Sequence, residues 1–189
     1  LLPGGDIRTD IPAYRVFENG EHTATLADAT SYYTPDMVSF LIGCSFTFET
    51  ALQDNGIEVA HIAQQRNVPM FKTSIPTTPA GVFSGPMVVS MRPIPAAQVS
   101  DAVRITSRYP SVHGAPVHVG DPAAIGIADL NRPDFGDPGE VPEGCLPVFW
   151  ACGVTPQAIV MESKPRLAIT HAPGQMLVTN ARDQDFLIP

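Results

Sequence analysis

The stretch MVVSMRPIPAAQVSDAVRITSRY, residues 87–109, decides the fold class of this sequence. Its first part, Met87 to Met91, is a short and mostly apolar run that is typical of a buried strand. From Pro95 to Tyr109 the pattern changes to helical spacing, and one face carries Val99, Ala102, Val103 and Thr106. A buried strand that leads into an amphipathic helix predicts an α/β fold.

The N-terminal segments add a hairpin and two helices to this prediction. Tyr14–Glu18 and Glu21–Thr23 flank Asn19-Gly20, a pair that supplies the positive φ angles of a tight hairpin turn. Thr34-Pro35 is typical of a helix start, and the apolar face expected after it holds Met37, Val38, Leu41 and Ile42. A second helix is expected after Gly43-Cys44-Ser45, ending at Asn55-Gly56.

The C-terminal segments continue the alternation. Val148–Cys152 is expected to form a second buried strand, and Pro156 to open a short helix capped by Thr155. Two further strands are predicted at Leu167–Thr170 and Met176–Thr179. The sequence therefore predicts an α/β protein with a mixed β-sheet flanked by helices and a smaller α+β subdomain.

Proline placement suggests where that subdomain begins. The proline-rich stretch from Pro76 to Pro86 is the expected entry, and the loop from Gly114 to Gly120 the expected exit. The predicted division assigns residues 1–66 and 121–189 to a main domain and residues 67–120 to the smaller one.

Composition excludes several classes of function. The 189 residues carry a formal net charge of −8 and no Lys/Arg run, which argues against binding to nucleic acid or to anionic membranes. No apolar stretch approaches the roughly 18 residues that a membrane span needs. Three cysteines, Cys44, Cys145 and Cys152, cannot all pair with one another. Because the chain shows no secretory signal, we expect reduced thiols and a cytoplasmic protein.

The densest group of titratable residues is the loop that holds His113, His118 and Asp121 among glycines and prolines. Loops held by a rigid scaffold often carry catalytic groups, so these three are candidate catalytic residues. In the structural alternative, each histidine bonds a backbone carbonyl and Asp121 caps a turn before Pro122. A third interpretation adds His171 and makes the four a metal site, although the spacing matches no metal motif.

The two segments around Cys44 and Cys152 each precede an expected helix start. Backbone N–H groups and the helix dipole favour an anion there, either a substrate carboxylate or a thiolate. The candidate substrate-binding residues of these segments are Cys44, Ser45, Cys152, Gly153 and Thr155. Alternatively, Cys152 is a small buried apolar residue.

Glu49 and Arg92 are charged residues in apolar surroundings. Glu49 follows Phe46 and Phe48, where a carboxyl with a raised pKa could act as a general acid or base, although an exposed helix start would also suit it. Arg92 ends an apolar strand, and its planar fork suits a substrate carboxylate.

Several of these segments together resemble one known family. They are DIRTDIPAYRV (6–16), GCSFTFE (43–49), VVSMRP (88–93), HGAPVHVGDP (113–122), PVFWACGVTPQ (147–157) and ITHAPG (169–174). Similar segments occur in the bacterial hydro-lyases called YcsI-like and in the N-terminal domain of mitochondrial D-glutamate cyclase. The resemblance runs from Asp6 to Thr179, and it implies that an N-terminal region of the family is missing here.

The resemblance implies a hydro-lyase that acts on a small carboxylate-bearing amino acid, with cyclisation of D-glutamate to 5-oxo-D-proline and loss of water as the candidate reaction. The residues can be given roles in it: Arg92 for the carboxylate, His113 or His118 as base, Glu49 or His171 as acid. Amides after Cys44 or Cys152 would hold the oxyanion. No cofactor is expected, and no GxxxxGK[ST] or GxGxxG motif is present.

Two other functions stay open from the sequence. One is a binding module without catalysis that senses or delivers an amino acid or oxoproline. The other is a metal-dependent hydrolase that uses His113, His118, Asp121 and His171. The expected partner is a small-molecule substrate, with neither nucleic acid nor membrane, and assembly into a homo-oligomer is left open.

Overall fold

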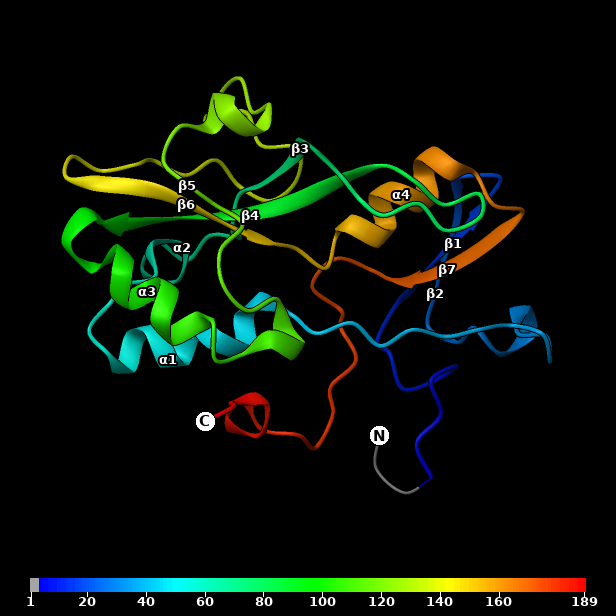
Figure 1. Ribbon diagram of the computed structural model, residues 1–189. Coiled ribbons are helices and arrows are strands. Elements are labelled where there is room, and N and C mark those ends of the chain that lie inside the picture. The colour runs from blue at the N-terminus through cyan, green and yellow to red at the C-terminus, as the bar shows by residue number, and fades with distance from the viewer. Residues whose placement is uncertain (1–3) are drawn as a thin grey trace. The chain divides into compact units, whose positions relative to one another are not determined.

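The computed structural model describes residues 4–189 and divides the chain into two compact units (Figure 1). Unit 1 comprises Leu1–Leu41, described from residue 4 on, with Pro79–Gly85 and Pro156–Arg182. Unit 2 comprises Ile42–Thr78, Pro86–Thr155 and Asp183–Pro189. These bounds differ from those of the two expected domains, and the domain division stays a prediction.

Unit 1 is built on a three-stranded antiparallel sheet of order β2-β1-β7. Its strands are β1 (Tyr14–Glu18), β2 (Glu21–Leu26) and β7 (Leu167–His171). Asn19 and Gly20, at φ 53° and 82°, turn the chain between β1 and β2. The hairpin that the Asn-Gly pair predicts is therefore confirmed, as is the strand expected at Leu167–Thr170.

Unit 2 is built on a four-stranded sheet of order β3-β4-β6-β5. The strands are β3 (Met70–Pro76), β4 (Pro86–Pro95), β5 (His118–Val119) and β6 (Cys145–Ala151). The two predicted buried strands are confirmed as β4 and β6. The expected mixed sheet is wrong, because all the strand pairings of residues 4–189 are antiparallel. The long connection that carries the predicted helix brings β6 back along β4 in the opposite direction.

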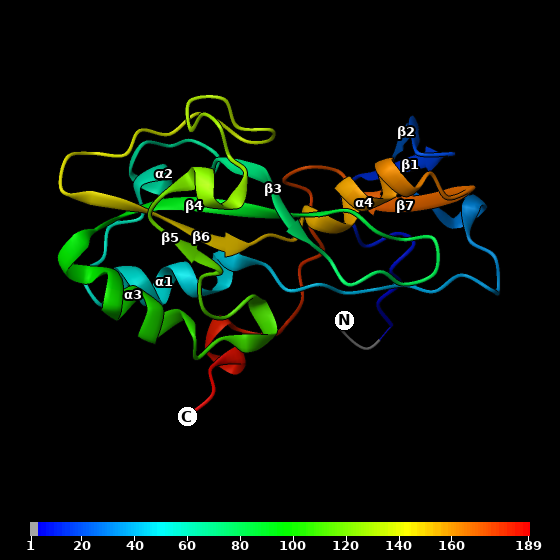
Figure 2. The same cartoon turned by 45° about the horizontal axis from the view of Figure 1, so that its top comes forward.

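Helices cover one face of the unit 2 sheet. A 3₁₀ turn, Ser45–Phe48, leads into α1 (Glu49–Asp54), and α3 (Val99–Thr106) lies beside it on the same face (Figures 1 and 2). The remaining α-helices are α2 (Ala60–Ala63) and α4 (Thr155–Ser163). Further 3₁₀ turns occur at Thr30–Tyr32, Ala96–Gln98, Pro110–Val112, Pro122–Ile125 and Asp183–Phe186. Within residues 4–189, every helix is too short or too polar to cross a membrane.

Strand alternation gives the unit 2 sheet two different buried faces. The first face packs against α1 and α3, and its core includes Phe48, Leu52, Ile94, Ile105 and Trp150. The second face packs against the chain after Pro122–Ile125, with Phe71, Val89, Met91, Ile125 and Phe149. Because side chains alternate along β4, Arg92 shares the first face with Ile94. The fold thus places a charged side chain beneath α1.

Two predicted elements are wrong. The expected helix after Thr34-Pro35 is a single turn, in which Met37 N–H donates to the Thr34 carbonyl. Val38 and Phe40 beyond it are 76% and 78% exposed, so no burial of an apolar face stabilises a helix there. The expected strand Met176–Thr179 belongs to neither sheet, and Val178 is 84% exposed.

Candidate functional site

The centre of the candidate site is the guanidinium of Arg92, on β4. Its side chain is 0% exposed, and Cζ lies 5.3 and 5.4 Å from the ring centroids of Phe48 and Trp150, which are 5.6 Å from each other. A cation over aromatic faces is attracted by their quadrupoles, and the attraction is larger away from water. The two rings therefore form an apolar wall beside a permanent charge.

The N–H groups of Arg92 are bound within unit 2. Nε donates to Glu49 Oε1 at 2.9 Å, and Nη2 donates to the same oxygen and to Ser45 Oγ at 3.1 Å. Nη1 donates to Ser90 Oγ at 3.0 Å. The sequence predicted a substrate clamp at Arg92, but the guanidinium faces Glu49, so a ligand carboxylate would have to compete with that residue.

Glu49, the first residue of α1, receives a further donor from α2. His61 Nε2 lies 3.1 Å from Glu49 Oε1, and because a carboxylate only accepts, this nitrogen carries the hydrogen. Burial raises the pKa of Glu49, but the His61 hydrogen bond and the charge of Arg92 outweigh it, so the pKa lies below its ordinary value. Glu49 is thus an ionised carboxylate, where the sequence predicted a carboxyl with a raised pKa.

Sequence reasoning missed His61 and Ser90 as members of this cluster. Ser90 could have been found, because it stands two residues before Arg92 on a strand and must share its face. His61 belongs to a four-residue helix without a capping side chain, and its contact with Glu49 spans separate helices. No local pattern announces such a contact.

His113 presents an unpaired nitrogen close to Arg92. It follows the 3₁₀ turn Pro110–Val112 at φ 83°, a left-handed conformation that is uncommon for residues other than glycine. Its ring hydrogen-bonds the Gly43 backbone, while Nε2 is buried without a partner. Burial lowers the pKa of His113, and the charge of Arg92 acts in the same direction against the Gly43 bond. The imidazole is therefore neutral at neutral pH, with a free lone pair.

The segment before Cys44 fits closely against the one before His113. A Cβ on Gly43 would lie 2.5 Å from the Ser111 carbonyl oxygen and 2.6 Å from Val112 Cγ1. The Gly43 carbonyl in turn lies 3.7 Å from where a Cβ of Gly153 would be. Glycine at position 43 thus allows three segments far apart in the sequence to meet.

Both nearby cysteines are protonated thiols. Burial raises the pKa of Cys44 and that of Cys152, and in each case neighbouring backbone amides offset only part of the effect. Cys152 Sγ lies 3.5 Å from Met70 Sδ. The charge of Arg92 also lowers each pKa, but burial has the larger effect, so both sulfurs remain thiols and the thiolate interpretation is not favoured.

His118 and Asp121 are not brought to this cluster. His118, on β5, pairs with Phe149 and packs on its ring with centroids 5.8 Å apart, on the sheet face opposite Arg92. Its Nε2 hydrogen-bonds the Asp121 carbonyl at 2.7 Å, and the Asp121 carboxylate accepts from Ala123 N–H at 3.0 Å. These contacts match the alternative interpretation of the sequence, in which the histidine bonds a backbone carbonyl and Asp121 caps a turn.

The remaining candidates lie elsewhere or bond the backbone. His171 belongs to β7 of unit 1, where its Nδ1 pairs with the Ala172 carbonyl at 2.8 Å. Thr155 does not cap its helix: its hydroxyl accepts from Val88 N–H at 2.9 Å and lies 3.2 Å from the Val88 carbonyl. Within residues 4–189, no three His, Cys, Asp or Glu side chains are grouped as metal ligands would be.

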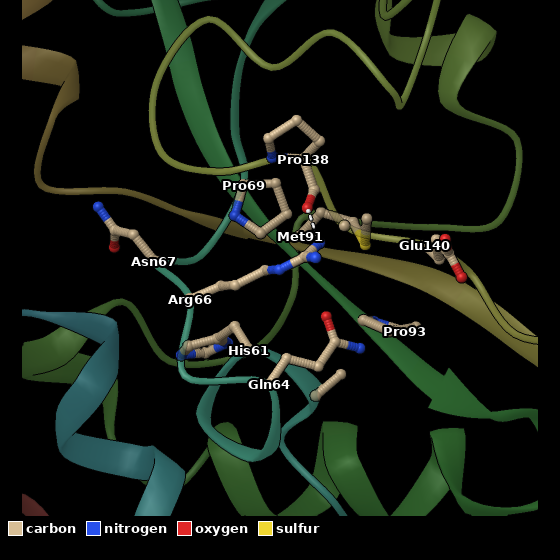
Figure 3. Close-up of a pocket in the computed structure, with 11 residues that line it drawn as sticks. His61, Gln64, Arg66, Asn67, Pro69, Met91, Pro93, Pro138 and Glu140 are labelled. Carbon is tan, nitrogen blue, oxygen red and sulfur yellow. Dashed lines mark hydrogen bonds between the residues drawn. The ribbon is translucent and has the colours of Figure 1, made fainter.

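A recess opens beside α2, with His61 on its wall (Figure 3). The Arg66 guanidinium crosses it, and Nη1 donates to the Pro138 carbonyl at 3.2 Å. It is lined by Ala60, His61, Gln64, Arg66, Asn67, Pro69, Met91, Pro93, Pro138, Gly139 and Glu140. His61 is the residue that this recess shares with the Arg92 cluster.

The cluster combines groups that suit proton transfer at a small molecule. It holds an ionised carboxylate, a neutral imidazole with a free nitrogen, two thiols and a buried cation. A neutral imidazole can take a proton from a ligand and return it. The raised pKa values of Cys44 and Cys152 keep both as thiols, which favours acid–base chemistry over covalent catalysis by a thiolate.

Comparison with known proteins places the chain among close relatives. A family model described as D-glutamate cyclase matches residues 38–180. The chain is 71% identical over its full length to "Putative hydro-lyase cu1581" of Corynebacterium urealyticum and 69% identical to "Putative hydro-lyase jk0403" of Corynebacterium jeikeium. It covers 72% and 70% of those proteins. A hydro-lyase of the same description from Mycolicibacterium gilvum is 63% identical over 189 residues.

Proposed function

The chain belongs to the D-glutamate cyclase family of hydro-lyases, and on that premise we propose that the Arg92 cluster of unit 2 is its active site. The proposed substrate is a small amino acid that bears a carboxylate, with D-glutamate as the first candidate and 5-oxo-D-proline as its product. The observation that carries the proposal is the buried, unpaired Nε2 of neutral His113. A buried polar atom without a partner is rare in folded proteins and calls for a functional reason.

His113 is the proposed proton carrier. In the cyclisation, the amine nitrogen attacks the γ-carboxyl carbon, a nitrogen–carbon bond forms and a carbon–oxygen bond breaks. The nitrogen loses two protons and the departing oxygen gains two, so one water leaves and the balance closes. Nε2 of His113 accepts the first proton from the ammonium, which frees the amine lone pair for attack, and passes it to that oxygen; the second proton takes the same route as the lactam forms. Both reacting groups belong to one molecule, so the site mainly has to hold it folded.

Arg92 supports this chemistry without clamping the substrate. Its hydrogen bonds to Glu49, Ser45 and Ser90 fix the guanidinium in place. A fixed positive charge stabilises negative charge that develops nearby in a transition state, and it costs no reorganisation when the reaction occurs. We assign Arg92 this electrostatic role, in place of the carboxylate clamp expected from the sequence.

Nuclear magnetic resonance on ¹³C-labelled D-glutamate tests the proposal. We expect the γ-carboxylate signal to decay and a lactam signal to appear without ATP or nicotinamide. His113→Ala should lower the rate about 10²- to 10⁴-fold, the usual cost of removing a general acid or base. His22→Ala, an exposed histidine of unit 1, is the matched control.

The outcomes separate the rival functions. A thermal shift with D-glutamate and no turnover would favour the amino-acid or oxoproline binding module. Turnover lost to a chelator and restored by zinc would instead favour the metal-dependent hydrolase. Turnover of another amino or hydroxy acid, with D-glutamate inert, would keep the hydro-lyase class and replace the substrate. A cytoplasmic location and any homo-oligomer stay predictions.

A further inference from the structure

The two oxygens of the Glu49 carboxylate have different surroundings. Oε1 accepts two hydrogen bonds from Arg92, and His61 Nε2 lies 3.1 Å from it. Oε2 accepts none within the described chain, residues 4–189. The carboxylate is therefore anchored through one oxygen, and the other is left for something outside the protein.

Oε2 is also not sealed from solvent. His113 Nε2 is the one fully buried side-chain nitrogen or oxygen without a partner among the described residues. Oε2 also has no partner, but it is not fully buried, since His113 Nε2 is the one atom that combines both properties. Oε2 therefore retains some accessible surface, although Glu49 as a whole is only 5% exposed. It is the exposed acceptor of an otherwise buried carboxylate.

A negatively charged acceptor in these surroundings selects the ligand group that it binds. The two donors on Oε1 hold the carboxylate in one orientation, so little freedom is lost when a ligand arrives. A charged donor gains the most from such an oxygen, because charge-assisted hydrogen bonds are roughly twice as strong as neutral ones. A second carboxylate would be repelled.

We propose that Glu49 Oε2 binds the ammonium group of the substrate and is the specificity determinant for an amine-bearing ligand. This inference rests on the proposed function, since it assigns a role within the same site. It predicts that the site distinguishes an amino dicarboxylate from the same dicarboxylate without the amine. Glu49, which the sequence suggested as an acid, becomes the residue that holds the reacting nitrogen.

Calorimetry on the wild-type chain tests this without a variant. D-glutamate and glutarate differ only in the amine, so their affinities report on the ammonium contact. We expect D-glutamate to bind about ten-fold more tightly or better, as a hydrogen bond to a charged group provides. Equal affinities would overturn the proposal, and so would failure of D-glutamate to bind.

A pair of variants then locates the contact. Glu49→Gln removes the charge, and we expect the preference for D-glutamate over glutarate to disappear. Asp101→Asn, an exposed acid on α3, is the matched control and should keep it. Circular dichroism establishes that each variant is folded; should Glu49→Gln not fold, the wild-type comparison decides alone. A folded Glu49→Gln protein that keeps the full preference would contradict the assignment.

Failure of this inference differs from failure of the proposed function. If the wild type prefers D-glutamate but converts no substrate, the ammonium site stands and the hydro-lyase proposal falls. If D-glutamate is converted while glutarate binds equally well, the hydro-lyase proposal stands and the ammonium site falls. The two experiments therefore use separate readouts on one protein.

Discussion

Arg92, which is fully buried, binds Glu49, which is 5% exposed: Nε of the arginine donates to Oε1 of the carboxylate at 2.9 Å, beneath α1. Each residue satisfies the charge that the other brings into the core. Removing either one leaves an uncompensated buried charge, which is costlier than removing both.

This pairing predicts a pattern of stabilities. Arg92→Leu should lower the free energy of unfolding by about 3–5 kcal/mol, because Glu49 would keep its charge without a partner. The double variant Arg92→Leu, Glu49→Leu should lose less than Arg92→Leu alone. Urea denaturation of the two proteins gives the comparison, and a double variant less stable than the single one would contradict the account.

The same pair predicts how stability responds to acid. The folded-state pKa of Glu49 lies below its ordinary value of 4.5, so its contribution is fully present above that value. The contribution is lost as the pH falls through the lowered folded-state pKa. Wild type should therefore lose more stability than Glu49→Gln between neutral pH and pH values below 4.5, in urea titrations followed by circular dichroism. Equal losses of stability in wild type and Glu49→Gln would contradict this assignment of the acid sensitivity to Glu49.

His113 predicts the acid limb of the activity profile. Its neutral form is the proposed base, and burial lowers its pKa below the ordinary 6.5. Activity should therefore persist below pH 6.5 and decline only as the pH falls through that lowered value. The pH dependence of kcat/KM, measured with D-glutamate, checks this. A decline centred above pH 6.5 would assign the base to another group.

Gly43 and Gly153 form a matched pair for mutation. Gly43→Ala would place a Cβ 2.5 Å from the Ser111 carbonyl oxygen, so backbone must move, and we expect a loss of about 1–3 kcal/mol. Gly153→Ala meets only an ordinary contact of 3.7 Å and should cost much less. Thermal unfolding of both variants measures the difference; equal losses would mean that the contact at Gly43 relaxes easily.

The two site cysteines should react slowly as nucleophiles. Burial raises the pKa of Cys44 and of Cys152, so less thiolate is present at pH 7 than for a free cysteine. In a Cys145→Ser background, alkylation by iodoacetamide should be slower than that of free cysteine and should accelerate in urea. Peptide mass spectrometry follows each site. Rapid modification of the folded protein would point to an activated thiol.

The parts of the fold that the sequence predicts correctly are those governed by neighbouring residues. Asn19-Gly20 supplies its own turn, and the run from Val88 to Met91 is apolar enough to be buried whichever strand it pairs with. Strand direction is different, because it depends on the end from which β6 returns to β4. The helix expected from Thr34-Pro35 failed for a related reason: its apolar face has nothing to pack against.

The candidate site divides in the same way. Glu49 and Arg92 were suspected as charged residues in apolar surroundings, Ser45 because it precedes an expected helix start, and His113 because it lies in a loop rich in titratable residues. Their mutual contacts were not predictable, because the chain must first bring α1 over β4. His61 is the clearest example: its bond to Glu49 joins two short helices, and nothing within α2 distinguishes this histidine from His22. His118 is the opposite case: its loop made it a candidate catalytic residue, but its ring nitrogen hydrogen-bonds the Asp121 backbone carbonyl.

The backbone of His113 sets catalysis and folding against each other. At φ 83° a side chain costs roughly 1 kcal/mol that glycine would not, and the unpaired Nε2 adds a desolvation cost. Relieving both would favour glycine at this position on grounds of stability alone. The proposed function thus rests on a residue that stability alone would not favour at this position.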